Sequence, residues 1–227
     1  VLFASNIAFI PVFFFASEYA QLSLGKSASS ASLVLLYFFL GFVVAAQIGG
    51  RLLDRVGAKR PVVSGCVLAA VGFWLWAGKL AGLHFGSQVA YVILAGAGMG
   101  MMLGPASTDA VNRASRLSYG EATGITQTVR NYAASLGLAV LGSLSVSTMH
   151  SRLTTSLVGQ GLGKAQAGSE ATRIAQARSA SGPIPRFVQL DFAYATRTVF
   201  YAMAGIMAVA ALIAFVGLRR GVQQLES

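Results

Sequence analysis

Charged side chains are scarce in this sequence. They make up 11% of its 227 residues, and only 7 are acidic, against 17 lysines and arginines. A soluble domain carries about 25% charged residues, roughly twice the share found here. Hydrophobic residues, in turn, make up 55% of the sequence. The composition therefore excludes an ordinary water-soluble surface and favours a protein that lies in a lipid bilayer.

Cysteine and histidine are nearly absent as well. The single cysteine, Cys66, lies in an apolar run and cannot form an internal disulfide or a cysteine metal site. His84 and His150 lie at the ends of different predicted helices without nearby carboxylates, so we expect no metal site. No serine or cysteine stands beside a base in a pattern typical of nucleophilic catalysis. We therefore expect no cofactor and no enzymatic centre.

The formal net charge of +10 raises nucleic acid as a partner, since clustered cations neutralise phosphates. The cations lie between apolar runs, however, which is where a multi-spanning membrane protein places them. We therefore expect the lipid bilayer, and no nucleic acid, as the partner of this chain.

Long uncharged runs are what the sequence does contain. Cutting it at its charged residues leaves six runs of 17 to 29 residues, and about 20 helical residues cross a bilayer. We predict an all-α polytopic membrane protein, a single six-helix membrane domain over residues 1–227. The helices are expected at about 1–20, 32–52, 61–79, 88–110, 119–149 and 194–218, with a long extracytoplasmic loop at about 151–191. Glu170 and Asp191 would be solvated in that loop.

Two local patterns support these helices. The sequence from Ser118 to Glu121 has the spacing of a capping box and predicts that the fifth helix begins there. In the fourth helix Gly96, Gly100 and Gly104 recur every four residues, so they share one face and allow another helix to approach closely.

The densest group of charges is residues 50–60, which we call the charged segment. It holds five of the 24 charged side chains in eleven residues and is expected to be a short polar turn between two helices. The charged segment shares its side of the membrane with two other groups of arginines, Arg113 and Arg116 after the fourth helix and Arg219 and Arg220 in the tail. This side then has eight lysines and arginines, or nine if Arg130 is counted. The opposite short loops have only Lys26 and Lys79, although six more cations lie in or beside the long loop. The positive-inside rule thus predicts that the 50–60 loop and the C-terminus are cytoplasmic.

The charged segment also carries a pattern. Gly50-x-Leu-x-Asp-Arg-x-Gly-x-Lys-Arg60 resembles the signature loop of the major facilitator superfamily. Three further stretches, residues 19–31, 122–137 and 193–200, resemble the fourteen-helix drug:proton antiporter branch of that superfamily, in the right order along the chain.

This resemblance implies a fragment, the C-terminal six-helix half of a secondary transporter whose N-terminal helix bundle is missing. Such transporters are two six-helix halves that rock about a central cavity. The implied function is proton-coupled efflux of drug-like or other small molecules, in a bacterial inner membrane. Two alternatives remain open: a metabolite uptake permease of the same superfamily, and a non-transporting polytopic membrane subunit. A membrane enzyme would need paired acid and base groups at one depth, which the sequence lacks.

Candidate site residues follow from these considerations. Asp54 and the cations of the charged segment would make or lose charge contacts at a cytoplasmic gate, the alternative being charge that only sets topology. Arg130, within the fifth helix, would face the gate or the cavity with Asp109 as a possible partner; the alternative is a side chain that reaches the interface. The predicted gate motif is Gly50, Asp54, Arg55, Gly57, Lys59 and Arg60, and the possible cavity-lining residues are Asn6, Tyr37, Gln127 and Asn131. Interhelical hydrogen bonding is the alternative use of the last four. No carboxylate is predicted near the membrane centre, so a proton-carrying residue would lie in the missing half.

Overall fold

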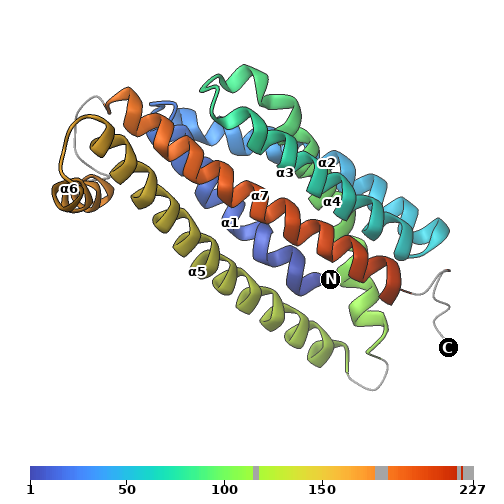
Figure 1. Ribbon diagram of the computed structural model, residues 1–227. Coiled ribbons are helices and arrows are strands. Elements are labelled where there is room, and N and C mark those ends of the chain that lie inside the picture. The colour runs from blue at the N-terminus through green and yellow to red at the C-terminus, as the bar shows by residue number, and fades with distance from the viewer. Residues whose placement is uncertain (115–117, 177–183, 219–220, 222–227) are drawn as a thin grey trace.

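The computed structural model describes residues 1–114, 118–176, 184–218 and 221 (Figure 1). Within these residues the chain forms α1 (Leu2–Leu22), α2 (Ala28–Val56), α3 (Lys59–Leu80), the short 3₁₀ helix η1 (Phe85–Ser87), α4 (Val89–Asn112), α5 (Tyr119–Gly159), α6 (Lys164–Gln176) and α7 (Arg186–Gly217). Six of them, all but α6 and η1, are long and apolar enough to cross a membrane. The predicted all-α fold with six spans is confirmed.

The six long helices form one elongated bundle. α4 packs between α2 and α3, α3 packs on α7, and α1 and α7 pack on α5. The core between them holds Phe15, Phe38, Phe73, Met99 and Phe200, one from each of five helices. Figure 1 shows the C-terminal ends of α2, α4 and α7 at one end of the bundle, with α6 at the opposite end. Arg116, Arg219 and Arg220, counted above for the topology, lie outside the described residues.

The start of α5 follows the predicted capping box. The Ser118 hydroxyl accepts a hydrogen bond from the Glu121 backbone N–H at 3.3 Å, and the Glu121 carboxylate accepts one from the Ser118 N–H at 2.8 Å. Both bonds satisfy donors that the first helical turn leaves without partners. The fifth helix therefore begins where the sequence predicted.

The predicted loop at 151–191 is wrong over much of its length. α5 continues to Gly159, α7 begins at Arg186, and α6 lies between them. The apolar residues Met149, Leu153 and Leu157 recur every four residues and form a second small core with α6 and the start of α7. At a rise of 1.5 Å per residue the 41 residues of α5 span about 60 Å, roughly twice the hydrocarbon thickness. Part of α5 must therefore project beyond the bilayer.

The prediction that Asp191 is solvated is also wrong. Its side chain lies in α7 and the residue is only 6% exposed. The Asp191 carboxylate accepts a hydrogen bond from the Ser156 hydroxyl at 2.7 Å, and the Arg152 guanidinium lies 4.4 Å from the Tyr194 ring centre. These contacts join the projecting parts of α5 and α7.

Glycines set the distance between α4 and its neighbours. A methyl group at Gly96 would collide with the carbonyl oxygen of Phe38, and one at Gly100 with that of Phe42, both on α2. Gly98, on the opposite face, lies against the Ala69 backbone of α3. The packing role predicted for Gly104 is wrong, because a methyl group there would meet nothing within 4 Å.

A buried polar chain joins α1, α3 and α4 at the end of the bundle opposite the charged segment. The Tyr19 hydroxyl donates to the Leu80 carbonyl oxygen at 2.8 Å and accepts from the Gln88 amide at 2.8 Å. The Trp76 indole N–H donates to the Gln88 side-chain oxygen at 3.2 Å. The Leu80 carbonyl oxygen, at the end of α3, thus accepts from the Tyr19 hydroxyl as well as from the Leu83 backbone N–H at 3.2 Å.

Replacing Tyr19 by phenylalanine should lower the unfolding free energy by about 1 to 3 kcal/mol, since it removes two buried hydrogen bonds. Thermal unfolding of the purified protein in detergent measures the change. Tyr132→Phe is the matched control, because Tyr132 is 65% exposed on α5. Equal melting temperatures for Tyr19→Phe and Tyr132→Phe would show that the buried chain contributes nothing.

Candidate functional site

The charged segment is mostly helical, which corrects the predicted turn over residues 50–60. α2 continues to Val56 and α3 begins at Lys59, so only Gly57 and Ala58 separate the two helices. Gly57 makes the short connection possible: its φ of 80° lies in the left-handed region that side chains disfavour. Its N–H still donates to the Leu53 carbonyl oxygen at 3.0 Å, which closes the last turn of α2.

Two of the predicted acidic residues line one small cavity. Asp54 lies exposed on the last turn of α2, and Asp109 lies on the last turn of α4. The cavity has a volume of about 130 Å³ and also borders Gly57, Thr108 and Asn112. The structure thus brings together the carboxylates of two helices that pack closely through their glycines.

The partner predicted for Asp109 is wrong. Asp109 is 6% exposed and pairs with Arg113 one turn later, Nε to Oδ2 at 2.7 Å, rather than with Arg130. The hydrogen bond to the Asp109 carboxylate raises the pKa of Arg113 above its ordinary value, so this guanidinium remains charged. The pair places one fixed cation beside the cavity that holds Asp54.

The other cations of the charged segment lie outside this cavity. Arg51, Arg55 and Arg60 are exposed, and the Lys59 ammonium lies 5.0 Å from the Phe215 ring centre. Within the described part of the chain none of these four forms an ion pair with a carboxylate. Gly50 borders open space. These cations are therefore available for contacts with another part of the protein.

The remaining site candidates do not converge on one cavity. Gln127 and Asn131 lie exposed on α5 and share a hydrogen bond of 3.1 Å, with the half-buried Arg130 on the same helix. Asn6 is 2% exposed and donates to the Leu2 carbonyl oxygen of its own helix at 2.8 Å. Tyr37 is half-buried, with its ring centre 5.8 Å from that of Phe85 in η1. Only Gln127, Arg130 and Asn131 lie together.

Sequence reasoning missed the pair between Asp109 and Arg113. The signal was present, because acidic and basic residues four apart on a helix face each other. It also missed the contact between Ser156 and Asp191, whose residues are 35 apart and carry no local pattern.

Apolar side chains cover the outer faces of α2 and α5. Leu36, Leu40 and Val43 on α2 are more than half exposed, and α5 exposes Ile125 and Tyr132. Such a surface suits lipid or a further helix bundle, and excludes open water as its surroundings.

Comparisons with known proteins agree with this architecture. The family model of the Major Facilitator Superfamily matches residues 1–168. The lincomycin resistance protein LmrB of Bacillus subtilis is 30% identical over 139 residues, which cover 60% of this chain and 29% of that protein. The cephamycin export protein CmcT of Amycolatopsis lactamdurans is 29% identical over 135 residues, 58% of this chain and 28% of that protein. The tetracenomycin C resistance and export protein of Streptomyces glaucescens is 30% identical over 141 residues, 62% of this chain and 26% of that protein.

The matched stretches thus span less than a third of each of these relatives. The family model, in contrast, extends over well more than half of the present chain and includes α1 to α5 with the charged segment. Together with six membrane-spanning helices, this match shows that the chain belongs to the major facilitator superfamily, a family of multi-pass membrane transporters for small molecules.

Proposed function

We propose that the chain forms the C-terminal half of a secondary active transporter that exports drug-like small molecules in exchange for protons. Three similar proteins are named for antibiotic resistance or export, which supports efflux over uptake. A six-helix bundle with apolar outer faces on α2 and α5 leaves room for a second bundle to complete the cavity.

The gate lies at the end of the bundle that carries the charged segment, and it is cytoplasmic in a bacterial inner membrane. The observation that carries this proposal is the cavity shared by Asp54 and Asp109, with the Arg113 cation beside it. A contact between a charge and a helix end contributes about 0.3 to 2 kcal/mol. Contacts of that size, made in one state and lost in the other, bias an equilibrium between two conformations without locking it.

The proton-carrying group belongs to the N-terminal half. The acidic residues that the structure describes lie near helix ends or in α6, as Glu18, Asp54 and Asp109 illustrate. Arg130, with Gln127 and Asn131, faces the cavity between the two halves from α5.

Ethidium efflux tests the function. Cells expressing the full-length protein should extrude ethidium, and a protonophore that collapses the pH gradient should abolish the extrusion. The 227-residue segment expressed alone should give the efflux of empty cells. Efflux by the segment alone would contradict the half-transporter proposal, and energy-dependent accumulation of substrate by the full-length protein would favour an uptake permease.

A further inference from the structure

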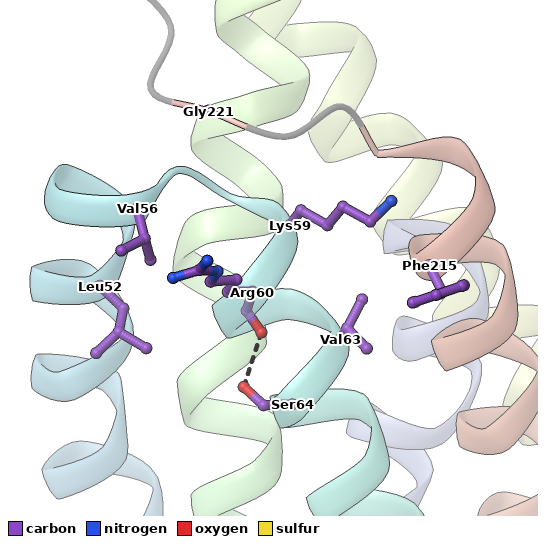
Figure 2. A pocket seen from close by; sticks show the side chains of 8 residues that line it. All are labelled: Leu52, Val56, Lys59, Arg60, Val63, Ser64, Phe215 and Gly221. Carbon is purple, nitrogen blue, oxygen red and sulfur yellow. Dashed lines mark hydrogen bonds between the residues drawn. The ribbon is translucent and has the colours of Figure 1, made fainter.

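A second hollow lies at the charged end of the bundle, and two of its lining residues, Lys59 and Arg60, belong to the predicted gate motif. It is a groove of about 770 Å³ where the end of α2, the start of α3 and the end of α7 meet (Figure 2). Leu52, Val56, Val63 and Phe215 give it apolar walls, and Lys59 and Arg60 supply two cations. The groove is therefore amphipathic, with charge of one sign.

The two cations reach across the groove in opposite directions. In Figure 2 the Arg60 side chain points toward α2, whereas that of Lys59 points toward Phe215 on α7. The Lys59 ammonium lies 5.0 Å from the Phe215 ring centre, and neither cation pairs with a carboxylate of the described chain. The carboxylate nearest in sequence, Asp54, borders the separate cavity with Asp109. Among the described residues no carboxylate lines the groove, so an anionic ligand would meet only positive charge from them.

Polar and apolar groups follow one another along the membrane normal. Lys59 and Arg60 are the first two residues of α3, at the level where a spanning helix meets the lipid headgroups. Val63 and Ser64 follow one turn deeper, toward the acyl chains. A ligand that fits this order has an anionic head and an apolar tail attached to it.

We propose that this groove binds an anionic phospholipid, with its headgroup between Lys59 and Arg60 and an acyl chain along Val63 and Phe215. Basic pockets between membrane helices recognise anionic headgroups, and the arginine fork matches two phosphate oxygens. The lipid joins α2 to α7 across the exposed face of α3. The site is independent of the transported substrate and of the direction of transport.

Native mass spectrometry of the full-length protein in a neutral detergent tests the proposal. Phosphatidylglycerol and phosphatidylcholine with identical acyl chains are titrated separately, and phosphatidylglycerol should occupy one site preferentially. The double variant Lys59→Gln/Arg60→Gln should bind the first phosphatidylglycerol about tenfold to thirtyfold more weakly, with phosphatidylcholine unaffected. Arg51→Gln/Arg55→Gln is the matched control: it removes the same charge from exposed positions outside the groove, and should leave the first binding event unchanged.

The apolar part needs its own variant. Ser64→Trp fills the groove without changing its charge and should also weaken phosphatidylglycerol binding, while the thermal unfolding temperature stays that of the wild type. Equal losses in the two double variants would overturn the proposal in favour of general surface charge, and an unaffected Ser64→Trp would overturn the acyl contact. Displacement of the lipid by an excess of glycerol phosphate would mean a site for free phosphate esters instead. Should the lysine and arginine double variant not fold, Arg60→Gln alone, at an exposed position, carries the same test.

Discussion

Adding one methyl group at both Gly96 and Gly100 should strongly destabilise the folded protein. In each case the new carbon would collide with a backbone carbonyl oxygen of α2, at Phe38 and at Phe42. A backbone atom cannot move aside as a flexible side chain does, so α2 and α4 would have to separate. Overpacking costs about 1 to 3 kcal/mol per site, and two sites remove a large part of a typical stability of about 5 to 15 kcal/mol. Size-exclusion chromatography of a fluorescent fusion of the full-length protein measures the folded fraction.

The matched control is Gly104→Ala combined with Gly142→Ala. Both glycines lie in membrane helices, and a methyl group at either meets nothing within 4 Å. This control should give the elution profile and melting temperature of the wild type. If it is as damaging as the Gly96 and Gly100 pair, the glycines act through helix flexibility and the close approach of α2 is not the cause.

Helix number and spacing could be predicted from the sequence because a bilayer imposes one length on every crossing. The glycine spacing likewise gave the right face of α4. It failed at Gly104, which is exposed, because a close approach depends on the partner as well: Gly41 and Gly49 of α2 lie against the backbone of Ile93 and Met101, and no backbone lies against Gly104 in this way. A repeat in one helix does not show which of its members a partner helix contacts.

The errors concentrate where polar composition hid a helix. Residues 151–159 have a hydrophilic composition, yet Leu153 and Leu157 continue an apolar stripe whose partners lie outside this stretch, on α6 and α7. The charged segment was similarly predicted as a turn, although α2 continues through the apolar residues Leu52, Leu53 and Val56 and ends directly before Gly57. The composition of a segment indicates whether it is exposed to water or lipid. Its backbone conformation depends on the few side chains that pack against other helices.

Neutralising Asp54 should slow transport and leave the protein in the membrane. In the proposed gate the Asp54 charge acts beside Asp109 and Arg113, so Asp54→Asn removes one contact of about 0.3 to 2 kcal/mol from the balance between two states. We expect the initial rate of ethidium efflux per molecule to fall about tenfold. Stability should change by less than about 0.5 kcal/mol, since Asp54 is exposed.

Membrane insertion separates the gate from a purely topological role. The positive-inside rule counts lysine and arginine, and carboxylates contribute little to it, so Asp54→Asn should insert in the wild-type orientation. Accessibility of a cysteine introduced at Arg55 to a membrane-impermeant thiol reagent measures that orientation. Glu170→Gln, the same neutralisation on α6 at the opposite end of the bundle, should transport like the wild type. Loss of membrane insertion in Asp54→Asn would mean that the charged segment serves topology. Equal slowing of efflux by Glu170→Gln would mean that only the overall charge matters, because a gate contact has to depend on where the carboxylate lies.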